Sequence, residues 1–360
     1  MVAAPTRVAP LVATATATAR TSDAKPVSDS LSPPAASLHF LVAADWGGLP
    51  VWPWVTPAQR GVAAAMGRVA EAEHSAFCLS LGDHFYFHGV RSAEDKRWRR
   101  TFERPFSAPA LKAPGFFRVV AGNHDHAGNI SAQLAYASRP RSRWRYPALQ
   151  HAWRETLADE QRTSVAFVLI DTVELCGMPR ARGATPRATP AWAWVERALA
   201  AAEDADYIVV GGHYPVHSPS SHGPTACLQR RLQPLLRRHR ASLYVSGHDH
   251  ALFHVTDDGG GASPVQFHGV GAGFMTTNSR RHAHTCAAQL RFHHRHARTR
   301  DALVAGGFAG VRVTSGEGMT VEHIDSEGRT LYSHTVPPRG GWAAERANGR
   351  AGKRENVCFA

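Results

Sequence analysis

The stretch Leu79-Ser80-Leu81-Gly82-Asp83-His84-Phe85-Tyr86 passes from a short apolar run directly into a group of polar and aromatic residues. Four other stretches repeat this arrangement, in which an apolar run is followed by glycine with carboxylate, amide or imidazole residues. They are residues 41–48, 119–125, 208–213 and 244–250. Open α/β sheets place their sites at the carboxyl ends of strands. The five stretches therefore predict one composite site at the edge of a sheet.

The residue types in these five stretches suit two adjacent metal ions. Carboxylate, imidazole and amide oxygen are hard to borderline donors, appropriate to iron, zinc or manganese. One Asp-x-Gly or His-x-His alone is a weak sign, because such triplets are more often turns or surface features. Five clusters in one order, each at a strand end, indicate a metal site. Glycine beside each cluster lets the backbone turn tightly, so that the ligands can approach one another.

Short apolar strands alternate with helices along most of the chain, which predicts βαβ units and a largely parallel sheet. Strands are expected at 39–44, 76–81, 116–121, 165–170, 207–210 and 242–246. Helices are expected after Thr56-Pro57 and after Thr189-Pro190, where a capping threonine precedes proline. A third helix is expected around 228–236. From Val265 onward, shorter strands with glycine-rich turns (308–314, 319–324 and 330–335) predict a second sheet packed on the first.

The two ends of the chain, residues 1–37 and 339–360, differ in composition from the domain expected at 38–338. The first segment is rich in Ala, Thr, Ser and Pro and has no acidic residue before Asp23, which is typical of a disordered leader or a targeting segment. Threonines interrupt its apolar part, so a secretory signal and an organellar transit peptide remain alternatives. The last segment is rich in Gly and Arg, and we expect a disordered tail.

Composition limits the possible partners. The net charge of +12 favours anionic partners, among which phosphate esters and nucleic acids both qualify. The arginine clusters at 97–100, 139–145 and 291–300 match no nucleic-acid module, so we expect no nucleic-acid partner, although such a module is the competing function class. No apolar run is long enough for a membrane span. Five cysteines without C-x-x-C spacing exclude a zinc ribbon and allow at most two disulfides.

The order Asp-x-Gly, Gly-Asp-x-x-Tyr, Gly-Asn-His-Asp, Gly-His-Tyr-Pro and Gly-His-Asp-His resembles that of calcineurin-like metallophosphoesterases. Tyr86 narrows the resemblance to purple acid phosphatases, and more closely to their small mammalian, tartrate-resistant type. Supporting stretches are 80–90, 95–97, 101–103, 121–136, 171–177, 222–225 and 227–228, and the similarity spans 38–338. A protein serine/threonine phosphatase would carry Asp-Arg-Gly where Phe85-Tyr86-Phe87 stands, and a phosphodiesterase of this superfamily would normally lack Tyr86.

The resemblance implies an α/β fold of four layers, αββα, in which two mixed sheets lie between helices. It implies an acid phosphatase that hydrolyses phosphate monoesters by attack of a hydroxide bound to a binuclear Fe(III)–M(II) centre. Two carboxylates and one phenolate would leave the two ions with net positive charge, which suits a phosphate anion. Fe(III) would be held by Asp45, Asp83, Tyr86 and His250, and the divalent ion (Fe, Zn or Mn) by Asp83, Asn123, His213 and His248. His124 and His222 match positions that contact the phosphate or the leaving oxygen.

The same resemblance implies a disulfide between Cys176 and Cys227 and glycosylation at Asn129, in the sequon Asn129-Ile130-Ser131. Both features point to an oxidising compartment on a secretory route, lysosome-like or extracellular, with organellar import as the alternative. The expected partners are phosphate-ester substrates, either small molecules or phosphoproteins, and the chain is expected to be a monomer.

Several residues depart from the family pattern. His84 stands where asparagine is usual; we expect it to point outward behind the ligands, with a phosphate contact as the alternative. His217 replaces an aromatic residue and is expected to line the mouth of the site without binding metal. Thr276 replaces an aspartate at the start of a loop that represses activity in the family, so the loop is expected to repress weakly and to remain exposed at Arg280-Arg281. The histidines at 282, 284, 293, 294 and 296 are expected on solvated basic segments.

Overall fold

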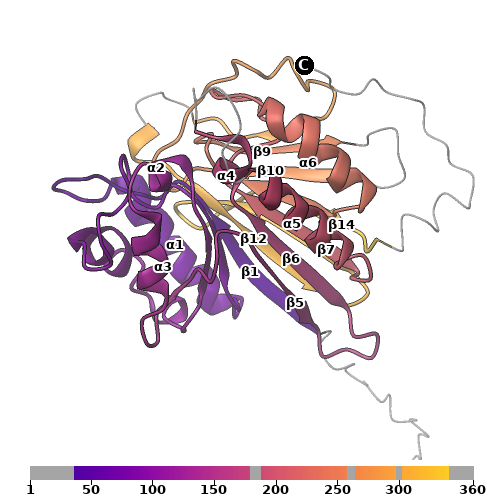
Figure 1. Cartoon of the computed structure of the whole chain (residues 1–360), viewed down its shortest axis with the longest axis horizontal. Coiled ribbons are helices and arrows are strands. Elements are labelled where there is room, and N and C mark those ends of the chain that lie inside the picture. Colours follow the sequence, from indigo (N-terminus) through magenta and orange to yellow (C-terminus); the bar gives the residue numbers. More distant parts are fainter. Residues whose placement is uncertain (1–35, 179–187, 258–263, 297–301, 340–360) are drawn as a thin grey trace, which may run out of the picture. The chain divides into compact units, whose positions relative to one another are not determined.

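The computed structural model describes residues 36–178, 188–257, 264–296 and 302–339. The predicted leader and tail, together with Cys358, lie outside the described residues apart from the few positions next to the domain. In the described part, the strands form two sheets of seven strands each (Figure 1). Among the same residues, no helix has the length and apolar character that crossing a membrane requires.

The first sheet has the strand order β14-β13-β12-β1-β2-β3-β4. Its parallel half consists of β1 (Ser37–Ala43), β2 (Cys78–Leu81), β3 (Phe117–Val120) and β4 (Trp144–Arg145). Its antiparallel half consists of β12 (Gly307–Thr314), β13 (Gly318–Asp325) and β14 (Thr330–Val336). The two halves join where β1 pairs with β12, residues from opposite ends of the described chain.

The second sheet has the order β11-β9-β10-β8-β7-β6-β5. Its parallel strands are β6 (Ser164–Ile170), β7 (Tyr207–Gly212), β8 (Leu243–Ser246) and β10 (Val265–Val270). Its antiparallel strands are β5 (His151–Thr156), β9 (Leu252–Asp257) and β11 (Leu290–His293). Both sheets are therefore mixed.

The expectation that the strands after Val265 build the second sheet is wrong. The second sheet already begins at β5, and β12, β13 and β14 extend the first sheet instead. The physical reason is that alternation and turn residues mark a segment as a strand, whereas its pairing partner depends on contacts distant in the sequence. Here β12 pairs with β1, which is the first strand of the chain.

The helices begin and end close to where capping residues predict. They are α1 (Pro57–Ala72), α2 (Asn123–His126), α3 (Ile130–Ala137), α4 (Thr172–Cys176), α5 (Ala188–Ala200) and α6 (Ala226–Arg238), with a π-helix at Trp98–Glu103 and a 3-10 helix at Pro109–Leu111. Thr56 caps α1: its hydroxyl accepts a hydrogen bond from the Gln59 N–H at 3.1 Å, and Pro57 takes the first helical position. Helix α5 already includes Ala188, so Thr189 lies inside it and is not its cap.

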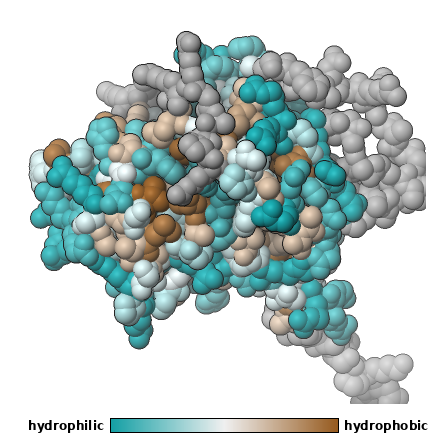
Figure 2. Space-filling view, viewed as in Figure 1, coloured by the Kyte–Doolittle hydropathy of each residue, from teal (hydrophilic) through white to brown (hydrophobic). Residues whose placement is uncertain are grey.

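Three apolar clusters of the described residues fill the spaces between four layers. The cluster between the sheets includes Phe40, Leu79 and Phe167. A second, with Met66 and Trp144, lies between the first sheet and its helices, and a third, with Trp192 and Leu232, lies between the second sheet and its helices. Figure 1 shows α1 and α3 on one side of the sheets and α5 and α6 on the other. On the face drawn in Figure 2, hydrophilic residues predominate and hydrophobic ones gather in patches. The predicted αββα arrangement is confirmed.

Candidate metal centre

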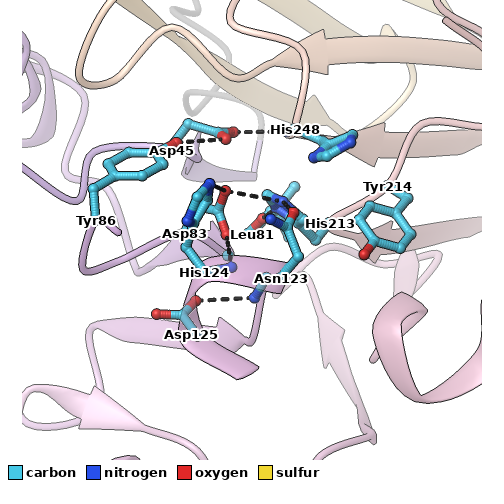
Figure 3. A network of polar contacts seen from close by, with 12 residues as sticks. Asp45, Leu81, Asp83, Tyr86, Asn123, His124, Asp125, His213, Tyr214 and His248 are labelled. Atoms are coloured by element: carbon cyan, nitrogen blue, oxygen red, sulfur yellow. Dashed lines mark hydrogen bonds and ion pairs between the residues drawn. The ribbon is translucent and has the colours of Figure 1, made fainter. Parts of the chain in front are cut away.

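The five polar clusters meet at one edge of the two sheets, just beyond the carboxyl ends of five strands (Figure 3). The first sheet supplies Asp45 after β1, Asp83 and Tyr86 after β2, and Asn123 after β3. The second sheet supplies His213 after β7, and His248 and His250 after β8. The structure thus brings together all seven side chains predicted as metal ligands, and neither sheet contains the whole set.

Close packing of backbone at the site requires glycine at particular positions. A Cβ atom on Gly122 would lie 2.3 Å from Asp83 Oδ1, and one on Gly247 would lie 2.3 Å from Asp45 Oδ2. Gly82, whose φ is +91°, would place a Cβ 2.6 Å from His213 Nδ1. Real Cβ atoms do not approach so closely, so any side chain at these positions would displace a predicted ligand.

Three predicted ligands hold their backbone in the left-handed region: Asp45 with φ 56°, Asp83 with φ 54° and His248 with φ 69°. For a residue with a side chain this conformation costs roughly 1–2 kcal/mol. Such strained residues cluster at functional sites, where the surrounding structure holds them in place. At these three positions the left-handed backbone turns the side chain toward the centre, although Trp54, His74, Arg141, Arg162 and Arg240 share a positive φ elsewhere in the described residues.

One half of the centre is built around His213. Asp83, His213 and His248 offer ligand atoms that all lie within 4.8 Å of one another. The His213 Nε2 atom is 3.3 Å from Asp83 Oδ2 and 3.1 Å from Asn123 Oδ1. On its other side, Nδ1 lies 2.9 Å from the Leu81 carbonyl oxygen, which accepts a hydrogen bond from the Nδ1–H group and leaves Nε2 to face the centre. This donor set suits a divalent transition metal.

The other half of the centre is built around Tyr86. Its hydroxyl donates to Asp45 Oδ1 at 2.9 Å and lies 2.9 Å from His250 Nε2, which is itself 3.5 Å from Asp45 Oδ1. Burial, and then the carboxylates of Asp45 and Asp83, raise the pKa of Tyr86 well above its usual value. A phenolate at this position therefore needs a cation beside it. Oxygen and imidazole donors that converge in this way suit an ion of high charge.

Electrostatics between Asp83 and His213 also fit a cation. Burial alone would raise the pKa of Asp83, but the His213 imidazole outweighs burial and holds this pKa below its usual value. Burial alone would lower the pKa of His213, yet Asp83 and Asp45 raise it to about 10. A proton on His213 thus balances the buried carboxylates, and a metal ion would provide that positive charge in its place.

The two predicted catalytic histidines lie beside this centre. The His124 N–H donates to Asp83 Oδ1 at 2.9 Å, and its Nδ1 lies 2.7 Å from the Phe87 carbonyl oxygen. The His222 ring stacks on the His248 ring, with centroids 4.3 Å apart. Both line a cavity of about 670 Å³ that is also lined by Asp83, Tyr86, Asn123, His248 and His250. A substrate in this cavity would contact both the proposed metal ligands and the two histidines.

Comparison with known proteins shows the family to which the chain belongs. Residues 38–252 match the family model described as calcineurin-like phosphoesterase. Tartrate-resistant acid phosphatase type 5 of Sus scrofa is 39% identical over 85% of this chain and 88% of its own length, and the Homo sapiens protein is 39% identical over 84% and 92%. Purple acid phosphatase 4 of Arabidopsis thaliana is 31% identical over 67% and 69%. The chain belongs to the purple acid phosphatases, within the calcineurin-like phosphoesterases.

Solved structures show the same fold. The Plasmodium protein titled GAP50, the anchor in the inner membrane complex, aligns with a TM-score of 0.70 at 22% identity, over 84% of this chain and 90% of its own. The purple acid phosphatase PPD1 from yellow lupin seeds aligns with a TM-score of 0.59 at 13% identity, over 86% and 55%. Family membership makes this purple acid phosphatase a hydrolase, which confirms the enzyme class predicted from the five motifs.

His84 of this purple acid phosphatase does not point outward as expected. It is fully buried, with Nε2 2.9 Å from Ser80 Oγ and Nδ1 3.1 Å from Asp125 Oδ2, and it packs between the Trp46 and Trp144 rings. Its place is beneath the site, outside the cavity lining, so a phosphate contact is also excluded. No signal in the sequence pointed to this arrangement, because Asp125, Trp46 and Trp144 are all distant from His84 in the chain.

Asp125 has a structural role that the sequence analysis did not assign. Its carboxylate accepts hydrogen bonds from the N–H groups of Gly122 and His84, at 2.9 and 3.1 Å, and from Gln133 Nε2 at 2.9 Å. It thereby caps the start of α2, the short helix that carries Asn123 and His124. Asp125, the last residue of the Gly-Asn-His-Asp motif, thus holds in place the helix that carries the two residues before it.

The prediction that His217 lines the mouth of the site is wrong. Its side chain is buried, with Nδ1 3.3 Å from Cys286 Sγ and its ring edge against Phe267. Burial lowers the pKa of His217 to about 4, so it is neutral and occupies the apolar space that an aromatic residue would fill.

The histidines expected on solvated basic segments are less exposed to solvent than predicted. His284 is exposed, but the histidines at 282, 293, 294 and 296 are half-buried.

The predicted disulfide is present, and it joins Cys176 at the end of α4 to Cys227 near the start of α6. Cys78 is fully buried in β2. Asn129 is exposed at the cap of α3, where its side chain accepts a hydrogen bond from the Ala132 N–H, and Ser131 of the sequon is exposed as well. The sequon is therefore accessible to a modifying enzyme.

Proposed function

We propose that this acid phosphatase hydrolyses phosphate monoesters at a centre of two metal ions. The proposed ligands are the seven predicted from the sequence: Asp45, Asp83, Tyr86, Asn123, His213, His248 and His250. The observation that carries this proposal is the pairing of two donor groups, one around His213 and one around Tyr86, at the junction of the sheets. Asp83 is the natural bridging ligand, because its carboxylate lies within reach of His213 while its charge acts on Tyr86.

Each protein group has a role that follows from its position. When bound, Fe(III) and a divalent ion (Fe, Zn or Mn) supply the Lewis acidity that activates water and offsets the charge of the phosphate. His124, held by Asp83 and Phe87, is placed to donate a hydrogen bond to the phosphate. His222, exposed in the cavity, is placed to give a proton to the leaving oxygen. Such general acid assistance is typically worth about a hundredfold or more.

The substrates and the setting of the enzyme belong to the same proposal. The cavity is open to phosphate esters of small molecules or of phosphoproteins, and the net charge of +12 favours such anions. The disulfide and the exposed Asn129 sequon support a secretory route, either lysosome-like or extracellular. We propose a monomer that binds no nucleic acid.

The test combines metal analysis with turnover of 4-nitrophenyl phosphate. The purified protein should contain two metal ions per chain, at least one of them iron, and should release nitrophenol in acid. Chelation should abolish turnover and metal addition should restore it. Full turnover after metal removal would contradict the metal centre. Salt-dependent retention on DNA without any turnover would favour the competing nucleic-acid-binding function instead.

A further inference from the structure

The segment 218–223, which carries His222, is attached to the buried carboxylate of Asp249. In the described residues, the two carboxylate oxygens accept four hydrogen bonds from this segment. The donors are Ser218 Oγ at 2.5 Å, Ser221 Oγ at 3.0 Å, the His222 N–H at 2.8 Å and the Gly223 N–H at 3.2 Å. Asp249 is completely inaccessible to solvent, although it stands between two proposed metal ligands in the chain.

A second contact holds the same segment from the side of the loop after Met275. The His282 N–H donates to the Pro219 carbonyl oxygen at 3.1 Å, and His282 Nδ1 lies 2.7 Å from the Ser220 carbonyl oxygen. Gly223 has φ +76°, and a Cβ there would lie 2.7 Å from the His282 ring. The segment is thus enclosed between Asp249 and His282, with little room to shift.

Burial makes the hydrogen bonds of Asp249 decisive for the conformation of the segment. An ionised carboxylate removed from water must be hydrogen-bonded, because an unpaired buried charge is strongly unfavourable. A movement of the segment that broke these contacts would leave the buried carboxyl group of Asp249 without its four donors. The backbone of His222 is therefore held in place, and from this position its ring stacks on His248, at a centroid distance of 4.3 Å and an interplanar angle of 27°.

We infer that Asp249 is a positioning residue that fixes His222 over the metal centre, and that its effect on the reaction passes through His222. This inference rests on the proposed role of His222 as the proton donor to the leaving oxygen. Asp249 itself is fully buried and does not touch the substrate. Its function is to convert a surface segment into a rigid support for one imidazole.

The test is a double-mutant cycle with two substrates that differ in their need for a proton. Methyl phosphate has a poor leaving group that requires protonation, whereas 4-nitrophenyl phosphate does not. His222→Ala should lower kcat on methyl phosphate by about a hundredfold and on nitrophenyl phosphate far less. Asp249→Asn should lower kcat on methyl phosphate by about tenfold or more and on nitrophenyl phosphate by less than about threefold. Added to His222→Ala, it should have no further effect.

A matched control is Asp257→Asn, which changes another buried carboxylate on the same sheet that accepts hydrogen bonds from Gln233 and Arg237. It should leave the ratio of the two substrates at the wild-type value. The metal content of the Asp249→Asn protein should equal that of wild type. If Asp249→Asn does not fold, Ser221→Ala removes one of the four donors and should give a smaller loss in the same direction.

Two results would overturn the inference. One is an Asp249→Asn loss of the same size with and without His222, since the two residues would then act independently. The other is loss of metal from Asp249→Asn, which would show that Asp249 supports the neighbouring ligands instead. If His222→Ala lowers both substrates equally, the proposed acid role of His222 fails. In that case the non-additivity of the two substitutions in kcat/KM still decides whether Asp249 acts through His222.

Discussion

At the scale of single residues, Asp83 is the side chain that we propose as the bridge between the two metal ions. Its Oδ1 accepts a hydrogen bond from the His124 N–H, and its Oδ2 lies 3.3 Å from His213 Nε2. Its backbone has a φ of 54°. We predict that Asp83→Asn loses both metals and turnover together, because the amide removes the anionic ligand that the two ions would share in the proposed centre. Metal content and 4-nitrophenyl phosphate turnover, measured on the same samples, check this. Retention of two metals per chain would show that Asp83 does not bridge.

Tyr86 makes a separate prediction about colour. A phenolate bound to Fe(III) absorbs visible light through charge transfer, so the iron-loaded protein should be pink or purple. Tyr86→Phe keeps the ring, which packs on Phe274, but removes the hydroxyl that lies 2.9 Å from Asp45 and His250. The visible band should disappear in this variant while the far-ultraviolet circular dichroism is unchanged. A colourless wild type that contains its full iron would contradict the assignment.

That the seven proposed ligands would meet at one place was predictable from the sequence, because each lies in a short motif directly after a strand. The orientation of other histidines was not. His84 is buried because Asp125, Trp46 and Trp144 surround it, and none of these is close to it in the chain. His217 is buried against Cys286 and Phe267, which come from a later loop and strand. Side-chain direction at such positions is set by tertiary neighbours.

At the scale of elements, the disulfide ties α4 to α6 across 51 residues of chain. Closing a loop of this length in the unfolded state is worth about 4 kcal/mol in the chain-entropy model. We predict that Cys227→Ser lowers the free energy of unfolding by an amount of this order. Urea unfolding of the variant and of wild type, followed by intrinsic fluorescence, measures the difference. Free thiols at both positions in protein isolated from its source would contradict the bond itself.

The loop after Met275 makes a prediction about proteolysis. Arg280 and Arg281 are exposed as expected, but the loop is anchored: the Thr277 N–H donates to the His250 carbonyl oxygen, and Asn278 is bonded to His296. Because Thr276 offers no carboxylate to compete with phosphate, the intact chain should already be nearly fully active. Trypsin cleavage at these arginines, confirmed by mass spectrometry, should raise turnover only slightly. A rise of about tenfold, which is 1.4 kcal/mol in the barrier, would show that repression survives without the aspartate.

Strand boundaries of the central strands were predictable to within a residue or two, since apolar runs bounded by glycine mark buried strands. The edge strand β5 was not predicted. Its sequence His-Ala-Trp-Arg-Glu-Thr alternates between buried or half-buried and exposed positions. As the last strand of its sheet, β5 pairs with β6 alone, so it lacks the continuous apolar run that marks a central strand. Strand β9 was missed because it follows directly on the Gly-His-Asp-His motif without a turn signal in the sequence.

At the scale of the whole molecule, a group of histidines joins the two sheets away from the proposed metal centre. His254 on β9 stacks on His268 on β10, with ring centroids 4.1 Å apart. His268 Nδ1 is 2.9 Å from His323 Nε2 on β13 of the other sheet, and His254 Nδ1 is 2.9 Å from the Tyr332 hydroxyl on β14. Burial lowers the pKa of His254 and of His323 to about 3.

These shifts predict that the protein loses stability in acid. Above pH about 6.5 the imidazoles are neutral in both states. As the pH falls below that value, the unfolded chain takes up protons that the folded chain cannot take up until pH about 3. At pH 5 each such imidazole therefore costs about 2 kcal/mol. The urea midpoint should fall from pH 7 to pH 5, and it should fall less in His323→Gln. His284→Gln, at an exposed histidine, is the matched control and should behave as wild type.

The division of the ligands between the two sheets has a consequence for biosynthesis. The first sheet supplies Asp45, Asp83, Tyr86 and Asn123, and the second supplies His213, His248 and His250, so neither sheet contains the whole proposed centre. A newly made chain whose sheets have not yet docked would present only fragments of each coordination sphere, and such fragments release metal quickly. For the proposed centre, we therefore expect the sheets to dock before the metal is bound tightly. The fraction of tightly held metal in a preparation would therefore report how many molecules had completed assembly. Metal content would then be a measure of correct folding as well as a requirement for the reaction.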